Sequence, residues 1–408
     1  MADHGRISRG KTRTEPPSGV PRTVAVVTTG RADYWLLVPV LRALDAIRDT
    51  VTMVYATGTH LSEQHGRTVE RIEADGWHIA ERILSEPGVG DAPMAEKMAR
   101  CATGFARAFH DSPPDTCVLL GDRFETLAAA TAASASGIPI CHIHGGEIST
   151  GALDNQFRYA ITALANLHCV ATAKARDRLI AMGESPDAVI RTGAPGLDHV
   201  AGFEPMPRDR FCHEAGLKGE DPFLLVTLHP ETIGGGDIAI DGNALDACLA
   251  LERALIDLGM PCLVTAANQD QGGAEINKGL KIMCEGMGCP FVESLGPLYH
   301  HAMHHAAVMV GNSSSGIIEA ASFGLPVVNI GERQGGRERS GNVVDCATDH
   351  ASITDAVRRA VAMDVSGVEN VYAAPEGESA GERIAAAITA MPLGADALRK
   401  RFEPPGLS

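Results

Sequence analysis

The sequence predicts an α/β protein with two Rossmann-like domains that face a central cleft. Two features indicate this class. Short apolar runs alternate with helical patterns along residues 23–330, and the alternation breaks at residues 203–222, where Pro, Gly and charged residues cluster. Strands that alternate with helices form parallel sheets covered by helices. At roughly 150 residues per domain, a chain of 408 residues allows two to three domains.

The first domain is expected over residues 22–203. Residues 1–21 precede it and are polar and rich in Arg, Pro and Gly, so we expect them to form a disordered extension. Apolar runs typical of strands buried on both faces occupy residues 23–27, 51–55, 116–120, 139–143 and 167–172. Helical patterns occupy residues 35–47, 63–75, 124–136 and 158–167.

The second domain, the nucleotide-binding one, is expected over residues 204–385. Its apolar runs predict strands at residues 223–228, 261–265, 306–310 and 326–330. Helical patterns lie between them at residues 244–258, 277–287 and 316–323. The remaining residues, 386–408, are predicted to form a C-terminal helix and tail.

Composition and charge exclude several classes of protein. Acidic residues outnumber basic ones by 51 to 35, and the net charge of −16 argues against a broad nucleic-acid surface, although it is compatible with a local basic pocket. No apolar run approaches the ~20 residues of a membrane span, and the basic N-terminus lacks the apolar core of a secretory signal. The ten cysteines include no CxxC pair and predict reduced thiols. We therefore expect a cytoplasmic protein without membrane or nucleic-acid partners.

Ligands of open α/β sheets bind where loops leave the carboxyl ends of the strands. In the first such loop, residues 28–34, Arg31 lies between a strand end and a helix N-terminus, which favours an anion such as phosphate. The alternative is a local ion pair between Arg31 and Asp33. The loop has one glycine rather than GxGxxG, so a dinucleotide site is not indicated. In the next such loop, Asp122 fits either a cap of the following helix or a catalytic carboxylate.

A dense polar cluster follows the predicted strand at residues 139–143. It has the sequence HIHGGE and combines histidines, glycines and a glutamate. Histidine and carboxylate groups can transfer protons near neutral pH, which favours His144 and Glu147 as catalytic groups. His142 lies within the strand and is predicted to be structural. The two glycines would let the backbone approach a ligand closely.

The second domain has comparable loops. His229 ends its first strand and can bind phosphate or transfer a proton, unless it is an ordinary surface histidine. Ser313 and Ser314 precede a helix whose free N–H groups favour an anion, and Glu319 can bind a sugar diol; the alternative is a serine N-cap without a ligand. The histidine-rich segment 299–305 is predicted to be a partly exposed helix rather than a metal site, since no carboxylate or cysteine partner is obvious nearby.

Together the loops form a specific series of motifs. In order along residues 28–346 they are TGRADY, GDRFETLAAA, HIHGGE with GALDN, RTGAPGLD, LVTLHPET and GNSSSGIIEAASFGLPVVNIGERQ. This series resembles the hydrolysing UDP-N-acetylglucosamine 2-epimerases, which make N-acetylmannosamine in sialic-acid pathways, and their relatives that act on bacillosamine-type sugars. The resemblance implies a two-domain fold like that of GT-B glycosyltransferases, with the active site in the cleft.

The resemblance also implies roles for individual residues. Asp122 and Asp154 match catalytic aspartates. Several family members have a glutamate where this chain has His144, and Asp154 is followed by Asn155 where a second aspartate is usual. These departures imply that acid and base roles are redistributed, with Glu147 as a candidate, or that the sugar differs. Nucleotide- or phosphate-binding positions are matched by Arg31, His229, Asn268, Ser313, Ser314, Glu319 and Arg333.

The activity implied by this resemblance is hydrolysing 2-epimerisation. UDP-N-acetylglucosamine, or a close UDP-2-acetamido sugar, would give UDP and a free N-acetylmannosamine-type sugar through a glycal intermediate. The reaction needs no metal or other cofactor, and a homodimer or homotetramer is expected. The alternatives are a hydrolysing epimerase of UDP- or GDP-N,N'-diacetylbacillosamine, a non-hydrolysing UDP-N-acetylglucosamine 2-epimerase, a GT-B glycosyltransferase, and a sugar-nucleotide sensor without activity.

Overall fold

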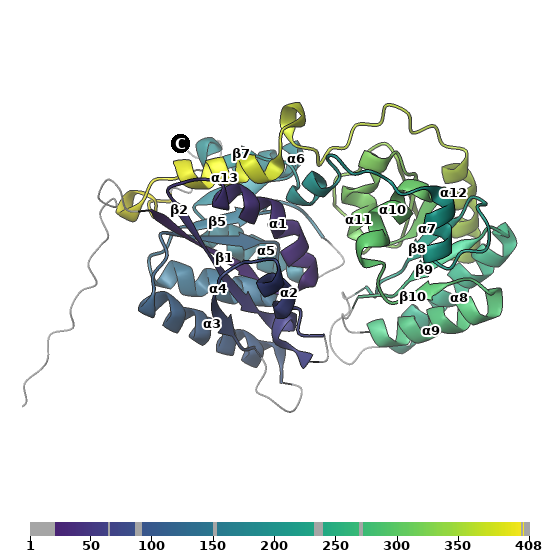
Figure 1. Ribbon diagram of the computed structural model, residues 1–408, viewed down its shortest axis with the longest axis horizontal. Coiled ribbons are helices and arrows are strands. Elements are labelled where there is room, and N and C mark those ends of the chain that lie inside the picture. Colours follow the sequence, from purple (N-terminus) through teal and green to yellow (C-terminus); the bar gives the residue numbers. More distant parts are fainter. Residues whose placement is uncertain are drawn as a thin grey trace, which may run out of the picture.

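Two parallel β-sheets, each enclosed by helices, form the two halves of the molecule (Figure 1). The computed structural model describes residues 21–63, 66–85, 92–149, 153–231, 240–268, 272–400 and 403. The predicted N-terminal extension therefore lies almost entirely outside the described residues. Both sheets are made of parallel strand pairs, as the alternation of strand and helix predicts.

The first sheet has seven strands in the order β3-β2-β1-β4-β5-β6-β7. In chain order they are β1 (Arg22–Thr28), β2 (Thr50–Thr57), β3 (Ile79–Ile83), β4 (Thr116–Leu120), β5 (Ile140–Ile143), β6 (Leu167–Val170) and β7 (Val189–Arg191). The central strands β1, β4 and β5 are almost wholly buried because both of their faces are covered. The change of direction in strand order falls between β1 and β4, where ligands of such sheets bind.

Helices cover both faces of this sheet. They are α1 (Arg31–Asp45), α2 (Val69–Ala74), α3 (Met94–Asp111), α4 (Phe124–Ala135), α5 (Asp154–Leu164) and α6 (Ala173–Ala181). One core contains the apolar sides of α1 and α2, and the core on the other face contains those of α3, α4 and α5. The helix predicted at residues 158–167 begins at Asp154, so this carboxylate lies in the first helical turn rather than in a loop.

The second sheet has six strands in the order β10-β9-β8-β11-β12-β13. They are β8 (Leu224–Thr227), β9 (Cys262–Thr265), β10 (Phe291–Val292), β11 (Val308–Gly311), β12 (Val327–Ile330) and β13 (Val343–Cys346). Their helices are α7 (Arg208–Glu214), α8 (Ile240–Leu258), α9 (Gly273–Met287), α10 (Tyr299–His305), α11 (Ser314–Ile318) and α12 (His350–Val361). The predicted connection at residues 203–222 contains α7, whose Phe211 is fully buried in the core of the second domain.

The last long helix, α13 (Ala380–Ala390), returns to the first domain. It packs on α1, and Ile384 and Ile388 belong to the core of the first sheet (Figure 1). A Cβ on Gly381 would lie 2.7 Å from the backbone of Pro39, so the two helices approach closely at this glycine. The packing therefore places residues 380–385 with the first domain and not with the second, for which they were predicted.

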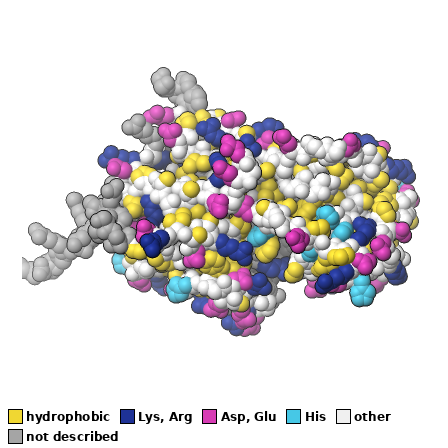
Figure 2. All heavy atoms as spheres, turned by 45° about the horizontal axis from the view of Figure 1, so that its top comes forward, with side chains coloured by type: hydrophobic (Ala, Val, Ile, Leu, Met, Phe, Trp, Pro, Cys, Tyr) yellow, Lys and Arg dark blue, Asp and Glu magenta, His cyan; other side chains and the backbone are white. Residues whose placement is uncertain are grey.

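The surface carries charges of both signs. Acidic and basic side chains are interspersed on the face shown in Figure 2, without a broad basic area on that face. Among the described residues, no helix has the length and apolar character needed to cross a membrane. All ten cysteines are free thiols, and eight of them are buried.

Candidate active site

The catalytic candidates of the first domain lie at the carboxyl ends of β4 and β5. Asp122 comes two residues after β4, and His144 directly follows β5. His144 has a φ of 64°, which is uncommon for a residue with a side chain and occurs preferentially at functional sites.

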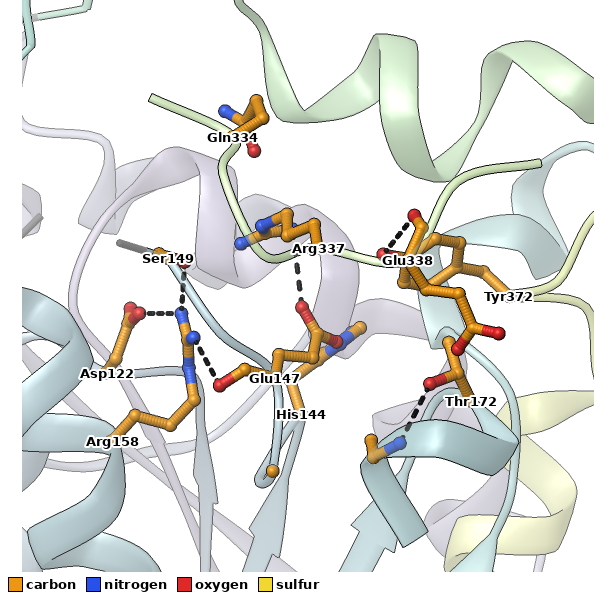
Figure 3. A network of polar contacts seen from close by, with 12 residues as sticks. Asp122, His144, Glu147, Ser149, Arg158, Thr172, Gln334, Arg337, Glu338 and Tyr372 are labelled. Atoms are coloured by element: carbon orange, nitrogen blue, oxygen red, sulfur yellow. Dashed lines mark hydrogen bonds and ion pairs between the residues drawn. The ribbon is translucent and has the colours of Figure 1, made fainter. Parts of the chain in front are cut away.

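His144 and Glu147 form a buried pair in this loop (Figure 3). The Nδ1 atom of His144 lies 2.5 Å from Oε1 of Glu147, and the two residues are 8% and 5% exposed. Burial raises the pKa of Glu147, but the charges of His144 and Arg337 and the hydrogen bond from His144 outweigh it, so the pKa falls to about 2. An ionised Glu147 can only accept, so Nδ1 of His144 carries the hydrogen and Nε2 is the atom that can exchange a proton.

Arg158 of α5 joins this pair to Asp122. Its guanidinium pairs with the Asp122 carboxylate and donates to the carbonyl of Glu147 at 2.9 Å and to the hydroxyl of Ser149 at 3.1 Å (Figure 3). The side chain is 3% exposed, so these contacts form in a nearly water-free setting. Asp154 precedes Arg158 by one helical turn on the same helix. The structure thus places all four predicted catalytic residues, Asp122, the His144–Glu147 pair and Asp154, around an arginine that no sequence motif singled out.

The two alternatives for Asp122 are separated by its contacts. The N-cap of α4 is Arg123, and within the described chain no side chain caps this helix. Asp122 is therefore held by Arg158 and does not cap the helix.

The two glycines of this loop lie where the chain packs closely against its own neighbours. Gly146 has a φ of 76°, and a Cβ there would lie 2.6 Å from the carbonyl of Ala175 in α6. A Cβ on Gly145 would lie 3.0 Å from Nδ1 of His142. His142 is fully buried, and its Nε2 hydrogen-bonds the carbonyl of Gly121 at 2.8 Å. The predicted structural role of His142 is confirmed, and the glycines allow close packing of the loop.

In the second domain, Asn312 fixes His229. The amide of Asn312 accepts from the His229 N–H at 2.7 Å and donates to its carbonyl at 2.9 Å. The His229 ring accepts the Asn268 N–H at Nδ1, also at 2.9 Å, so its proton lies on Nε2. Burial and, to a smaller extent, Arg333 lower the pKa of His229 to about 3. His229 is thus a neutral hydrogen-bond donor and not the surface histidine of the alternative prediction.

The loop after β12, residues 331–342, leads from this group back to the first domain. Arg333 donates to the carbonyl of Asn312 at 3.2 Å, and Gln334 donates to the same oxygen at 2.9 Å. Further along the loop, Nη1 of Arg337 lies 3.3 Å from Oε2 of Glu147. One short segment therefore links the predicted nucleotide residues to the predicted catalytic pair.

The serine loop after β11 differs in part from its prediction. Ser313 occupies the N-cap position of α11, but among the described residues its hydroxyl makes no capping bond; it lies 2.9 Å from the hydroxyl of Ser315. The helix is only five residues long, from Ser314 to Ile318, so its dipole adds little to anion binding. Glu319 follows this helix, and its Oε2 lies 2.9 Å from Nε2 of His300.

The remaining candidates have simple positions. Arg31 is exposed at the first position of α1. Asp33, its alternative partner, instead accepts a hydrogen bond from Thr29. The histidine-rich segment forms α10, where His301 accepts the N–H of Met206 and His305 bonds its carbonyl. In the described part of the chain, no three potential ligand side chains are grouped as a metal site requires.

A cavity of about 230 Å³ lies where the domains meet. Its lining includes Thr172, Lys174 and Arg178 from the first domain and Arg337 and Arg339 from the second. Glu147 borders this cavity as well as contacting the His144 ring. The cavity is therefore contiguous with the proton-transfer candidates.

Comparisons with known proteins identify relatives that match most of the chain. A family described as UDP-N-acetylglucosamine 2-epimerase matches residues 42–389. The chain is 36% identical to a UDP-N,N'-diacetylbacillosamine 2-epimerase (hydrolyzing) from Legionella pneumophila, over 93% of this chain and 98% of that protein. It is 31% identical to a GDP/UDP-N,N'-diacetylbacillosamine 2-epimerase (hydrolyzing) from Campylobacter jejuni, over 79% of this chain and 84% of that protein.

A solved structure supports the architecture. The UDP-GlcNAc 2-epimerase of Neisseria meningitidis, determined bound to UDP-GlcNAc, superposes with a TM-score of 0.76. The match covers 90% of this chain and 99% of that one at 16% identity, a level that shows the fold alone. The predicted GT-B-like arrangement of two α/β domains is confirmed.

Proposed function

This chain belongs to the UDP-N-acetylglucosamine 2-epimerase family, and on that premise we propose that it is a hydrolysing 2-epimerase of a UDP-linked 2-acetamido sugar. Its products would be UDP and the free sugar with inverted C2. The observation that carries the proposal is the His144–Glu147 pair, joined to Asp122 through Arg158 at the carboxyl edge of β4 and β5.

The reaction requires a way to break the C2–H bond. This carbon has no neighbouring carbonyl and is not acidic in the substrate. When the nucleoside diphosphate leaves C1, positive charge develops there and acidifies the C2 hydrogen. A base then removes the proton, and the electron pair forms the C1–C2 double bond of a glycal. Water adds its hydroxyl to C1 while a proton returns to C2 from the opposite face, so two proton-transfer groups are needed.

His144 and Asp122 are the proposed proton-transfer groups. Glu147 is a poor base, because both of its carboxylate oxygens are engaged and its pKa is about 2. Its role is to hold the His144 ring through Nδ1, which leaves Nε2 to exchange the proton. Asp122 is fixed by Arg158 and can serve the other face, with Asp154 in the neighbouring helical turn.

The leaving diphosphate needs donors that stabilise negative charge. His229 supplies Nε2–H as a neutral donor, and Arg333 supplies a positive charge beside Asn312. The hydroxyl of Ser313 is not used as a helix cap and can donate to phosphate. We assign the ribose to Glu319, whose second oxygen can accept from a diol while the first pairs with His300.

For the sugar, we propose the N,N'-diacetylbacillosamine class, which has a second acetamido group at C4 and a methyl group at C5. Support comes from the two relatives at 36% and 31% identity, both of which carry this activity in their names. UDP-N-acetylglucosamine is the second candidate, because the family as a whole is described by that sugar.

The decisive experiment offers the full chain UDP-N,N'-diacetylbacillosamine, GDP-N,N'-diacetylbacillosamine and UDP-N-acetylglucosamine separately, without added metal or NAD. NMR in deuterated water should show a free sugar with deuterium at an inverted C2, together with the nucleoside diphosphate. An epimerised sugar that remains attached to UDP would identify a non-hydrolysing enzyme. Retention of the original C2 hydrogen in the free product would exclude the elimination route, and a requirement for an acceptor would indicate a glycosyltransferase.

A further inference from the structure

The contact between Arg337 and Glu147 joins the two domains at the proposed proton-transfer pair. Arg337 lies in the loop after β12 of the second domain, and Glu147 lies in the loop after β5 of the first. The side chains are 14% and 5% exposed, and their charged atoms are 3.3 Å apart (Figure 3). An ion pair so shielded from water is stronger than one at the surface.

Glu147 thus has a different partner on each carboxylate oxygen. Oε1 accepts from His144 Nδ1, and Oε2 faces Arg337. The carbonyl of the same residue is held by Arg158. With its backbone and Oε2 both fixed, the carboxylate has little freedom to rotate, and the position of the His144 ring is fixed in turn.

We infer that Arg337 is a positioning residue for the proton transfer: docking of the second domain places its guanidinium on Glu147, which orients His144 and balances the charge beside it. This inference rests on the proposed function, in which His144 exchanges the proton. The nucleotide residues His229 and Arg333 belong to the same domain as Arg337, so nucleotide binding and completion of the proton-transfer group are linked through one loop.

The electrostatic consequence has a definite sign. Without Arg337, the negative charge of Glu147 acts on His144 uncompensated and favours the imidazolium form. A protonated ring cannot accept the C2 proton, so activity would appear only at higher pH. Besides Arg337, the charged group that acts on Glu147 is Arg158 from α5, which also pairs with Asp122. Arg178 from α6 contacts the carbonyl of Gly146, and Tyr372 faces Glu147 as a titratable group.

The neighbouring ion pair offers a matched control. Lys174 of the first domain lies 3.8 Å from Glu338 of the second, one residue after Arg337. This pair also crosses the domain boundary, but the Lys174 side chain is 71% exposed, and the charges that lower the pKa of Glu147 are those of His144, Arg337 and Arg158. Lys174→Gln therefore removes an interdomain contact and leaves the proton-transfer pair intact.

The experiment compares Arg337→Gln, Arg337→Lys and Lys174→Gln with the wild-type full chain. We expect Arg337→Gln to lower kcat by roughly 10–100-fold with KM changed less than about threefold, and to move the acid limb of the pH–rate profile up by about one pH unit. In Arg337→Lys, which keeps the positive charge, the acid limb should lie close to its wild-type pH. The Lys174→Gln profile should match that of the wild type.

A second measurement does not depend on turnover. NMR of histidine-labelled protein follows the titration of the His144 ring directly, with His144→Gln identifying its signal. The midpoint should rise by about one pH unit in Arg337→Gln and stay unchanged in Lys174→Gln. An unchanged midpoint in Arg337→Gln, or equal effects of both variants, would overturn the inference. Failure of all three nucleotide sugars to react would refute the proposed function while the titration still decides the role of Arg337.

Discussion

Arg158 holds the carboxylate of Asp122 from a position in α5 that is almost completely buried. The same guanidinium supports the main chain at Glu147, so it fixes two loops that are 25 residues apart in sequence, at positions 122 and 147. This buried cation is the centre of the polar network in the first domain. It holds acidic residues from two separate loops close together.

The first prediction concerns the stability that Arg158 contributes. Arg158→Gln leaves Asp122 without its cation, and breaking a buried pair from one side should cost about 3 kcal/mol of unfolding free energy. Arg100→Gln is the control, because Arg100 pairs with Glu96 on the exposed side of α3 and should cost less than about 0.5 kcal/mol. Urea unfolding measures both, and equal costs for the two variants would contradict the structural role assigned to Arg158.

The second prediction separates His144 from Glu147. His144→Gln should lower turnover by roughly 10²–10⁴, the usual contribution of a general acid or base, and erase a limb of the pH–rate profile near neutrality. Free histidine titrates near ~6.5 and glutamate near ~4.3. Glu147, with a pKa of about 2, cannot produce that limb. Glu147→Gln should cost less, since the amide oxygen still accepts from Nδ1. Near-normal turnover of His144→Gln with an inactive Glu147→Gln would reverse these roles.

The third prediction concerns nucleotide affinity. Ser314→Ala and Glu319→Ala should each weaken UDP binding by roughly 0.5–3 kcal/mol, because each removes one or two hydrogen bonds. Asp122→Asn should bind UDP almost normally but lose turnover, since Asp122 lies in the other domain. Isothermal titration calorimetry tests all three variants. Unchanged UDP affinity in the Ser314 and Glu319 variants would show that the nucleotide does not lie in the second domain.

The fourth prediction is acid sensitivity of the fold. The pKa values of His60, His142 and His229 are lowered to about 4, 3 and 3 by burial, with Arg123 and Arg333 contributing at His60 and His229. Unfolded histidine titrates near ~6.5, so below that pH the unfolded chain binds more protons than the folded one. The free energy of unfolding that these neutral histidines contribute is fully present above pH ~6.5. It declines as the pH falls, by up to about 1.4 kcal/mol per pH unit for each histidine.

Urea unfolding between pH 7 and pH 5 measures that slope. The slope reports how many more protons the unfolded chain binds than the folded one. His142→Asn removes one of the three histidines and should lower that number by about one. A wild-type slope of zero over this range would show that these histidines are not held neutral by the fold.

The sequence predicts the central strands of both sheets because these strands are buried on both faces. Residues 116–120 are buried throughout, four of the five are apolar, and they form β4 with the predicted bounds. The edge strand β3 has the sequence IAERI, in which two charged side chains are exposed, and no apolar run indicates it. The packing of α13 on α1 joins segments far apart in the sequence, and no local sequence pattern indicates such a contact. The sequence therefore did not predict that α13 joins the first domain.

The site was predictable where its residues follow strands. Asp122, His144 and Glu147 are adjacent to strand ends, and the resemblance to known motifs pointed to the same loops. Arg158 lies within a helix rather than after a strand. The one feature of the sequence that could have indicated its role is that it is a charged residue on the buried face of α5. Arg337 lies in the charge-rich segment GERQGGRERS, and only the meeting of the two domains distinguishes it from the arginines around it.

The return of α13 has a mechanical consequence. The guanidinium of Arg22, at the start of β1, pairs with the carbonyls of Ile388 and Met391 at the end of α13. The first strand and the last long helix are thus held together, and the second domain is an insertion in the chain between β7 and α13. A force applied at Arg22 and Met391 would load this contact directly and leave the second domain slack. New termini opened in the second domain, with the old ends joined, should accordingly keep the first domain folded.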